Sequence, residues 1–411
     1  MRAVIVGAGV VGLACAIELR RRGADVTLVE RSLPGAGASS GNAGWITPVF
    51  ATPLPAPGVV MTSLKWMLQP NSPLFIKPRI DFALFRWLWS FWRHANKMDF
   101  ERGVLAYAAF ASHAQADFDG LVAQGVPVQI EARGSLFLFT TPAGAEHLRH
   151  EVELMRDFGY GPVEILGPSE ARDLEPAVTA RVAGGILVPQ ERYLRPESMV
   201  DALVGKARAL DVELRTSTTA TGFRTAADRV VEVNTTSGSI AADEFVVAAG
   251  AWSQRLLATV GLRVPIEAGR GYGVTIEAPA TNLRRATYLA ESRIACTPFH
   301  GSLRLAGTME FSGLDAPLDP RRFDAIRRGA DQYLNGWRGG IEHEWAGPRP
   351  VTPDGLPVIG RTDRYQNLSI ASGHAMLGVT LAPSTAIAVA DLLCEGKSRY
   401  DLAAFRPSRF N

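Results

Sequence analysis

The first thirty residues show an order of apolar runs and helical periodicity that predicts a βαβ unit. Residues 3–6 are all apolar, which is typical of a short strand buried in a parallel sheet. A helical pattern follows over 11–22 and ends at Gly23, and a second strand is predicted over 25–30. Two parallel strands joined by a helix are the basic unit of a doubly wound sheet.

The rest of the chain mixes strand and helix patterns. Helices are predicted over 82–97, 104–123, 143–158, 196–209 and 381–393. Strands are predicted over 213–219, 229–235, 244–249, 273–276, 303–307 and 368–371. Residues 34–44 form a loop rich in Gly and Ser, and 48–78 are rich in proline. This order predicts a strand–helix dinucleotide domain interleaved with a sheet-rich second domain.

Composition narrows the class of protein. The chain has 411 residues, 47% hydrophobic and 20% charged, which is typical of a globular protein of about two or three domains. The formal net charge of +2 predicts no global field for binding nucleic acid. Three cysteines far apart (Cys15, Cys296 and Cys394) favour a reducing, cytoplasmic compartment. Glycines interrupt the apolar run after Arg2, so we expect no signal peptide, and no apolar stretch is long enough to predict a membrane span.

The turn GAGVVG at 7–12 has the spacing of a dinucleotide-binding fingerprint. Gly7 permits a tight turn, Gly9 lets the backbone approach a pyrophosphate, and Gly12 allows close packing of helix on strand. The N-terminus of the following helix favours phosphate. Glu30 ends the second strand, where a carboxylate accepts hydrogen bonds from ribose hydroxyls. It disfavours NADP but leaves NAD and FAD open.

Two later segments favour the longer cofactor. The loop GAGASSGNAG at 35–44 is built from small residues, and its backbone is expected to reach a long cofactor, with Ser39, Ser40 and Asn42 as donors. The segment EFVVAAGAWS at 244–253 is an apolar strand that ends in small residues, where a planar ring can rest against backbone.

Taken together, four motifs resemble the D-amino acid oxidase superfamily, within it the D-amino acid dehydrogenase and glycine oxidase branch. They are VIVGAGVVG at 4–12, SSGNAG at 39–44, VVAAGAWS at 246–253, and WAGPRPVTPDGLPVIG at 345–360 with ASGHAMLGVTLAP at 371–383. They occur in order across nearly the whole chain. The resemblance implies bound FAD. It also implies an α/β fold in which a Rossmann-type FAD-binding domain (1–81, 193–262 and 347–411) is interleaved with a smaller α+β substrate domain (82–192 and 263–346) on a mostly antiparallel sheet.

The motifs and the resemblance together assign the cofactor contacts. These are Gly7, Gly9, Val10, Val11, Gly12, Glu30, Arg31, Ser39, Ser40, Asn42, Ala43, Gly44, Ala220, Ala249, Gly250, Trp252, Gly373, Met376, Leu377, Gly378, Val379 and Thr380. Backbone near Ala220, in the strand that begins at Glu213, is expected to touch the adenine. Sarcosine oxidases, which are relatives, hold flavin through a cysteine near the RPVTPDG region. Residues 345–360 contain no cysteine here, so we predict non-covalent FAD.

The family reaction implied by the resemblance is hydride loss from the α-carbon of an amino acid to the flavin. Arg349 occupies the position of the relatives' carboxylate-binding arginine, and its planar guanidinium suits a bidentate contact. Arg270 and Tyr272 are weaker candidates for a second carboxylate contact and a hydroxyl donor. His374 is a candidate general base. N–H groups over 373–380 are expected to face the negative charge of reduced flavin.

Two other features of the sequence bear on metal and membrane binding. His147 and His150 lie three residues apart without a third ligand, so no metal site is predicted. Read as a helix, residues 82–97 have a basic stripe and an apolar side, which suits either an interfacial helix on a membrane or a helix packed inside the molecule. The stripe comprises Arg79, Arg86, Ser90, Arg93 and Lys97, and the apolar side comprises Leu84, Leu88, Phe91 and Trp92 with Trp87 and Phe85 on its flanks.

The function predicted is oxidation of a D-amino or cyclic D-imino acid, with electrons passed to a quinone or another acceptor, in the cytoplasm or peripherally on the inner face of the cell membrane. Bulky apolar residues suggest D-proline, hydroxylated D-proline or D-alanine as substrate. Three alternatives stay open: an oxidase that uses oxygen, an FAD-bearing subunit of a larger complex, and an NAD-dependent enzyme.

Overall fold

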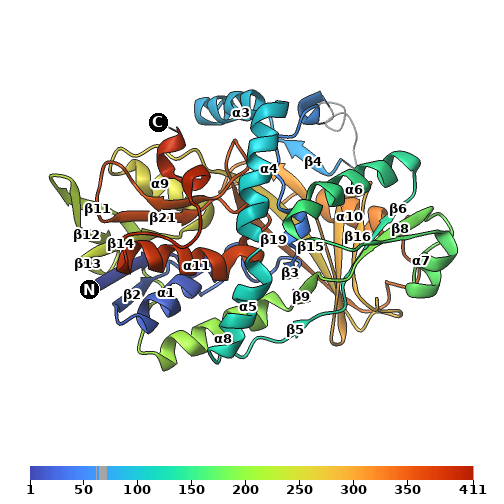
Figure 1. Cartoon of the computed structure of the whole chain (residues 1–411), viewed down its shortest axis with the longest axis horizontal. Helices are drawn as coiled ribbons and strands as arrows, with labels where there is room; N and C mark the ends of the chain where they lie inside the picture. The colour runs from blue at the N-terminus through green and yellow to red at the C-terminus, as the bar shows by residue number, and fades with distance from the viewer. Residues whose placement is uncertain (62, 64–71, 411) are drawn as a thin grey trace.

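A six-stranded sheet forms the half of the molecule that carries both chain termini (Figure 1). The structure is a computed structural model that describes residues 1–61, 63 and 72–410, so part of the proline-rich stretch over 48–78 lies outside the described residues. The strand order is β10-β2-β1-β14-β21-β20, parallel throughout except between β20 and β21. The strands are β1 (Arg2–Val6), β2 (Asp25–Val29), β10 (Glu213–Arg215), β14 (Glu244–Val247), β20 (Val358–Arg361) and β21 (Leu368–Ser372).

Both faces of this sheet are buried, which explains why β1 is apolar without alternation. Ala3 and Ile5 belong to one core, and Val4 and Val6 belong to the core on the other face. The first face is covered by α1 (Val10–Arg21), which packs against α8 (Pro196–Ala209) and α11 (Gly378–Cys394). The second face is covered by α9 (Ser253–Ala258) and by a three-stranded antiparallel sheet of β11 (Ala220–Ala226), β12 (Arg229–Thr235) and β13 (Gly238–Ala241).

A nine-stranded sheet forms the other half of the molecule (Figure 1). Its order is β19-β15-β18-β17-β16-β6-β8-β7, with β4 beside β18, and its ladders are antiparallel except β16–β6 and β18–β4. The helix α10 (Pro320–Asp331) packs on β15 and β18. The strands are β4 (Leu74–Ile76), β6 (Ser135–Phe139), β7 (Glu164–Leu166), β8 (Gly184–Val188), β15 (Glu267–Glu277), β16 (Ala286–Leu289), β17 (Ile294–Phe299), β18 (Ser302–Phe311) and β19 (Ile341–Val351).

Shorter elements connect the two halves. A three-stranded sheet is formed by β3 (Trp45–Ile46), β9 (Arg192–Leu194) and β5 (Ile130–Glu131). The helices α4 (Lys97–Ala111) and α5 (Ala114–Ala123) pack against α11 and run down the middle of the molecule in Figure 1. The other helices of the described residues include α3 (Phe82–His94), α6 (Pro142–Leu154) and α7 (Pro168–Leu174), with 3₁₀ turns at Pro48–Phe50, Arg156–Phe158, Gly250–Trp252, Ala403–Phe405 and Pro407–Phe410.

The predicted fold class is confirmed, and most element predictions differ from the structure only at their ends. The helix predicted over 196–209 has those bounds. The pattern over 104–123 contains two helices, because α4 ends at Ala111 and the Ser112 hydroxyl donates back to the Ala109 carbonyl (2.7 Å). The helix predicted over 381–393 begins earlier, at Gly378.

The predicted domain limits do not all coincide with gaps between elements. The limit at 192/193 falls inside β9, and the limit at 346/347 falls inside β19. Inside the segment 1–81, β4 pairs with β18 and so belongs to the nine-stranded sheet, called the second sheet below.

The stripe predicted along 82–97 is wrong in part. The segment contains two helices, since α3 ends at His94 and α4 begins at Lys97, and Arg79 lies before α3, where it pairs with Glu267 (3.0 Å). Trp87 is buried, whereas Trp92, placed on the apolar side, is exposed. The helix therefore has an apolar inner face and a second, exposed aromatic face.

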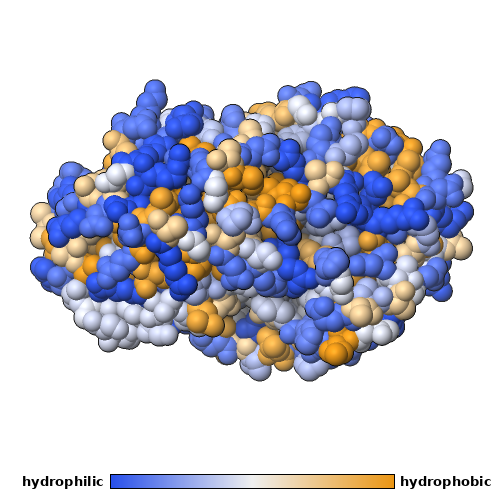
Figure 2. All heavy atoms as spheres, turned by 90° about the horizontal axis from the view of Figure 1, so that it is seen from below, coloured by the Kyte–Doolittle hydropathy of each residue, from blue (hydrophilic) through white to orange (hydrophobic). Residues whose placement is uncertain are grey.

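Within the described ranges, no helix is long and apolar enough to cross a membrane. The side of the molecule seen from below shows hydrophilic residues interspersed with small hydrophobic patches (Figure 2).

Candidate active site

A cavity of about 550 Å³ lies at the carboxyl ends of β1, β2 and β14, where parallel α/β sheets bind ligands. It extends from the glycine turn after β1 to β19 of the second sheet. Its wall includes most of the predicted cofactor contacts: Gly7, Gly9, Val10, Val11, Glu30, Arg31, Ser39, Asn42, Ala220, Ala249, Gly250, Trp252, Met376, Gly378 and Val379. Two predicted catalytic residues, Arg349 and His374, lie in the same wall.

The glycine turn has the geometry that its sequence predicts. Gly7 has a φ of +110°, and a Cβ there would lie 2.4 Å from the Ala248 carbonyl oxygen. A Cβ on Gly12 would lie 1.9 Å from the Gly7 carbonyl oxygen, so Gly12 serves helix–strand packing and does not line the cavity. Because Gly9, at the start of α1, brings no side chain, the helix N-terminus faces the cavity without a side-chain cap of its own.

Glu30 and Ser39 satisfy backbone donors at this end of the cavity. The Glu30 carboxylate accepts hydrogen bonds from the backbone N–H groups of Ala8 (2.8 Å) and Ser32 (3.0 Å). The Ser39 hydroxyl accepts from the N–H of Val10 (3.1 Å), the first residue of α1. A carboxylate fixed by two N–H groups still has free lone pairs, which it can offer to ribose hydroxyls.

The loop 35–44 is shaped by its own side chains. Asn42 donates to the carbonyls of Ala38 (3.1 Å) and Ser39 (2.8 Å) and accepts from the N–H of Gly44 (2.7 Å). The Ser40 hydroxyl donates to the Gly35 carbonyl (3.0 Å). Ser40, Ala43 and Gly44 are absent from the cavity wall, and the loop backbone that reaches it, beside Ser39 and Asn42, is that of Gly35, Ala36, Gly37 and Ala38.

Arg304, which sequence reasoning missed, attaches this loop to the second sheet. Its buried guanidinium lies on β18 and donates to the carbonyls of Ser40 (3.4 Å) and Asn42 (3.0 Å). It also donates to the Thr275 hydroxyl (2.9 Å) and pairs with Glu197 (2.6 Å) at the start of α8. No motif marks Arg304, because its partners come from three distant segments: the loop 35–44, β15 and α8.

The strand end after β14 and the segment before β11 form the opposite wall. Cζ of the Arg31 guanidinium lies 3.7 Å above the centroid of the Trp252 ring. This contact holds the two predicted cofactor contacts side by side. Ala220 lines the cavity with Thr218, Thr219 and Thr221. The prediction that Ala220 continues the strand from Glu213 is wrong, because β10 ends at Arg215 and Ala220 begins β11 of the three-stranded sheet.

The N-terminus of α11 closes the other end of the cavity. Gly378 and Val379 line the wall as the first residues of this helix, which has no side-chain cap. Gly373, Leu377 and Thr380 do not line it. The Thr380 hydroxyl instead donates to the Trp45 carbonyl (3.1 Å) and accepts from the Thr47 N–H. The helix therefore presents unpaired N–H groups and its positive dipole end to the cavity.

Arg349 is a cation without an acidic partner among the described residues. Its guanidinium donates to the Thr308 carbonyl (2.7 Å) and lies 3.9 Å from the Met309 sulfur. Burial lowers the pKa of Arg349 to about 10, so it stays protonated at neutral pH. A desolvated cation facing a cavity with one neutral acceptor is a site for an anion.

Backbone geometry makes room for this guanidinium. Gly271 of β15 lies beneath it, since a Cβ on Gly271 would be 2.3 Å from Cζ of Arg349. The pairing of β15 with β18 shifts register between Arg270 and Tyr272, and this bulge contains Thr308, whose φ is +58°. A bulge turns a carbonyl out of the ladder. Here the bulge orients the Thr308 carbonyl oxygen so that it accepts a hydrogen bond from Arg349.

Arg270 and Tyr272 do not line the cavity. Arg270 donates to the carbonyls of Pro317 (3.0 Å), Gly313 (3.3 Å) and Leu314 (3.1 Å). The Tyr272 hydroxyl donates to the buried Glu310 carboxylate (2.9 Å). These contacts favour structural roles for Arg270 and Tyr272. Side chains alternate between the two faces of a strand, so Gly271 lies under Arg349, whereas Arg270 and Tyr272 point to the other face.

His374 lies in the cavity wall but is a poor base. It is buried, and its Nε2 shares a hydrogen bond with the Thr385 hydroxyl (3.0 Å). Burial lowers its pKa to about 4. A ring with so little proton affinity gives little driving force for proton abstraction at neutral pH.

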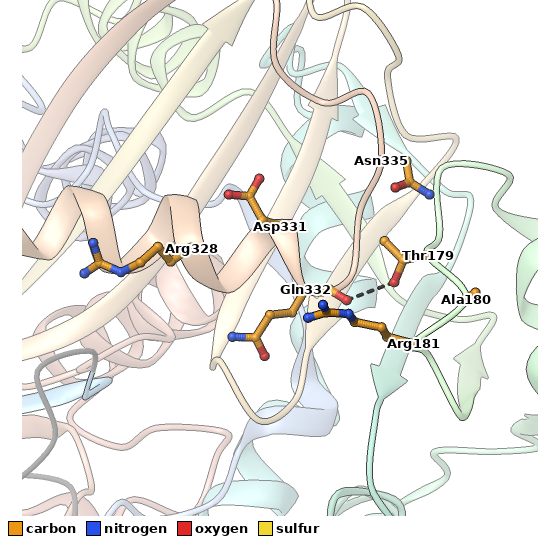
Figure 3. Close-up of a pocket in the computed structure, with 7 residues that line it drawn as sticks. All are labelled: Thr179, Ala180, Arg181, Arg328, Asp331, Gln332 and Asn335. Atoms are coloured by element: carbon orange, nitrogen blue, oxygen red, sulfur yellow. Dashed lines mark hydrogen bonds between the residues drawn. The ribbon is translucent and has the colours of Figure 1, made fainter.

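Another hollow, of about 600 Å³, lies between α10 and the segment before β8 (Figure 3). It is lined by Thr179, Ala180, Arg181, Arg328, Asp331, Gln332 and Asn335, with the Thr179 hydroxyl donating to the Gln332 carbonyl (2.9 Å). Asp331 is paired with Arg338 (2.8 Å) and Trp337 (3.0 Å). No dinucleotide motif reaches this surface.

No group of three or more metal-ligand side chains occurs in the part of the chain that the structure describes. His147 contacts Glu151 (3.3 Å) and Arg293 (3.2 Å). Of the cysteines, Cys15 and Cys296 are buried and Cys394 is exposed, and none lines the described cavity wall.

The six-stranded and nine-stranded sheets and the cavity between them define a dinucleotide-binding protein. Residues 2–392 match the family model described as DAO, FAD dependent oxidoreductase, and the chain belongs to this family. It is 32% identical over 424 residues to a D-amino acid dehydrogenase of Bradyrhizobium diazoefficiens, covering 100% of this chain and 99% of the relative. It is 33% identical over 406 residues to a D-amino acid dehydrogenase of Cereibacter sphaeroides, covering 96% and 92%.

The solved structure of glycine oxidase from Geobacillus kaustophilus has the same fold. Its TM-score is 0.75 with 26% identity, and the match covers 99% of each chain.

The residues present fit FAD, the cofactor of this family. An extended flavin dinucleotide needs a cradle for the pyrophosphate at its middle and donors to the flavin ring at one end. The glycine turn and the N-terminus of α1 provide the first, with Glu30 beside them. The uncapped N-terminus of α11 provides the second at the far end of the same cavity.

Proposed function

We propose that this FAD-dependent oxidoreductase oxidises a D-amino or cyclic D-imino acid to the imino acid, which water then hydrolyses to a 2-oxo acid. The observation that carries the proposal is Arg349, a desolvated guanidinium in the cavity wall that has no carboxylate partner among the described residues. The carboxylate of an amino acid is the anion that it fits. The relatives named D-amino acid dehydrogenase support the D configuration.

The protein's own residues bind and orient the substrate. Bound FAD supplies a two-electron acceptor for the hydride of the α-carbon. Arg349 holds the carboxylate, Thr308 and Gly271 keep the guanidinium in place, and the N-terminus of α11 stabilises negative charge at the flavin end of the cavity. No residue is required as base when the amine enters neutral, which agrees with the low pKa of His374.

The substrate pocket favours a small or cyclic apolar side chain. Met309 lies beside Arg349, while Ala375 and Met376 line the same wall, so the surroundings of the carboxylate site are apolar. D-Alanine, D-proline and hydroxylated D-proline fit this description. For the electrons we propose a quinone acceptor, with oxygen as the alternative.

A steady-state assay with a soluble dye acceptor tests the proposal. The purified holoprotein is expected to oxidise D-alanine or D-proline but neither L enantiomer, and to release no stoichiometric hydrogen peroxide under air. Peroxide in proportion to substrate would instead identify an oxidase. Turnover with neither enantiomer of any amino acid would favour the FAD-bearing subunit, and a colourless protein would favour NAD.

A further inference from the structure

The helix α3 exposes an aromatic face that nothing in the described structure covers. This aromatic face comprises Ile80, Phe82, Phe85, Trp89 and Trp92, with exposed fractions from 56% for Trp89 to 93% for Ile80. The four ring residues fall on one side of the helix, because they follow one another at spacings of three or four. Soluble surfaces carry single exposed apolar residues, whereas a contiguous group of large rings marks a binding site.

The opposite face of α3 is anchored in the protein, so the exposed rings are held rigidly. Leu84 and Trp87 are buried, and Trp87 packs against Phe311 with ring centroids 5.1 Å apart. The Trp87 indole N–H donates to the Val351 carbonyl (3.2 Å). Asp81 caps the helix by accepting from the N–H groups of Ala83 and Leu84. Such anchoring keeps the helix folded while its outer face stays in contact with solvent.

The charges around the aromatic face are mainly positive. Arg86 and Arg93 are exposed on the adjacent stripe of the helix, and the Arg93 guanidinium lies 4.8 Å from the Trp89 ring centroid. Lys77 is exposed before the start of α3, and Lys97, exposed after its end, is paired with Glu101. The acidic side chains nearby are paired: Asp81 with Arg79, Asp99 with His94, and Glu101 with Lys97. Tryptophan rings beside arginines are the composition of a helix at a membrane interface.

We propose that the aromatic face of α3 docks this protein on the surface of an anionic lipid bilayer. Phe82, Phe85, Trp89 and Trp92 enter the boundary between headgroups and acyl chains, and Arg86 and Arg93 contact anionic headgroups. The helix lies along the top edge of the molecule, so a flat surface can approach it (Figure 1). The side seen from below carries separate hydrophobic patches among hydrophilic residues (Figure 2).

Docking on α3 places the bilayer close to the active-site cavity. Val351, which accepts the Trp87 hydrogen bond, is next to Pro350 of the cavity wall and two residues from Arg349. The bilayer surface would therefore lie about one helix diameter, ~10 Å, from this wall. Delivery of electrons to a quinone in that bilayer rests on the function proposed above, whereas docking itself does not.

Co-sedimentation of the holoprotein with vesicles of phosphatidylcholine and phosphatidylserine tests the proposal. We expect binding that weakens with salt and with vesicles of phosphatidylcholine alone. The pair Phe85→Gln and Trp89→Gln is expected to abolish measurable binding. The pair Arg86→Glu and Arg93→Glu is expected to weaken it at least 25-fold, since each basic residue at an anionic surface accounts for roughly fivefold.

A matched control removes exposed apolar side chains elsewhere. Ile165 and Ile341 are 62% and 70% exposed on strands of the second sheet, and Ile165→Gln with Ile341→Gln is expected to bind vesicles like the parent. All variants should reduce a soluble dye with substrate at the parental rate, which shows that they are folded. Absence of vesicle binding by the parent, or equal loss in the control, overturns the proposal.

A second copy of the chain is the competing occupant of this face. Analytical ultracentrifugation of the parent and of the Phe85→Gln, Trp89→Gln pair distinguishes it. A dimer that the pair dissolves, without vesicle binding by the parent, would contradict membrane docking. Vesicle binding by a protein that oxidises no amino acid would leave docking intact and reject the proposed function.

Discussion

Arg349 is held by neutral groups, and its interaction with substrate is therefore expected to depend on geometry as well as charge. Lysine keeps the charge but cannot make two parallel hydrogen bonds to a carboxylate. We expect Arg349→Lys to raise KM for the D-amino acid roughly 10- to 100-fold, the worth of one charge-assisted hydrogen bond. The matched control is Arg255→Lys, because Arg255 lines the same cavity but is paired with Asp315 (2.7 Å). Equal effects of the two substitutions would argue against a carboxylate site at Arg349.

Gly271 offers a test that leaves every charge in place. A methyl group on Gly271 would overlap the Arg349 guanidinium, with Cβ only 2.3 Å from Cζ. Gly271→Ala is therefore expected to raise KM as Arg349→Lys does, measured by steady-state kinetics with a dye acceptor. Gly273→Ala is the control on the same face of β15, since its Cβ would meet nothing closer than 3.5 Å. An unchanged KM in Gly271→Ala would show that the guanidinium is not needed where the structure places it.

The buried His374 is expected to make the free energy of unfolding fall as the pH is lowered. Its pKa is about 4 in the folded protein and about 6.5 in the unfolded chain, so protonation favours unfolding. The stabilisation is complete above pH ~6.5 and is lost as the pH falls toward 4, by up to ~1.4 kcal/mol per pH unit. In urea unfolding, His374→Gln should lose less stability than the parent over this interval. His374→Gln should also reduce the dye at the parental rate. A slower rate of flavin reduction with unchanged stability would instead support His374 as the general base.

At the level of elements, Arg304 of β18 connects the nine-stranded sheet to the loop 35–44, part of which lines the cavity. Its removal leaves the carbonyl oxygens of Ser40 and Asn42 and the carboxylate of Glu197 without their donor. Unpaired polar groups cost roughly 1–3 kcal/mol each, so we expect Arg304→Met to weaken FAD binding at least tenfold. Release of fluorescent FAD on dilution measures this effect. FAD retention equal to that of the parent would show that the loop is held without Arg304.

Elements also show how far sequence reasoning reached. The turn 7–12 and the strand 3–6 were predictable, because the fingerprint reports backbone contacts between residues that are close in sequence. Arg304, Thr308 and Gly271 were not predictable, because their roles depend on the pairing and bulge of β15, β18 and β19. The sequence alone also suggested Arg270 and Tyr272 as substrate contacts. Without the strand register, the sequence does not show which face of β15 points toward the cavity.

The aromatic helix illustrates a different limit. The pattern of 82–97 indicated amphipathicity but not which apolar residues are buried, since rings occur around most of the helix. Only packing against Phe311 and Val351 determines that Trp87 faces inward and Trp89 outward.

On the scale of the whole molecule, we expect FAD to be held without a covalent bond. Cys15 and Cys296 are buried, and burial raises the pKa of both thiols, to about 12 for Cys15. Such thiols are poor nucleophiles. Acid precipitation should therefore leave all yellow colour in the supernatant. Flavin fluorescence that stays with the denatured chain in gel electrophoresis would contradict non-covalent binding.

The cavity shared by the two halves places Arg349 of the nine-stranded sheet beside the end of the six-stranded sheet that binds the cofactor. Anaerobic single-turnover mixing of the holoprotein with a D-amino acid tests this arrangement. We expect the flavin to be reduced, one 2-oxo acid to form for each flavin, and the corresponding amine without a carboxylate not to react. A flavin that stays oxidised with every D-, L- and imino acid, or that the amine reduces equally well, would contradict it.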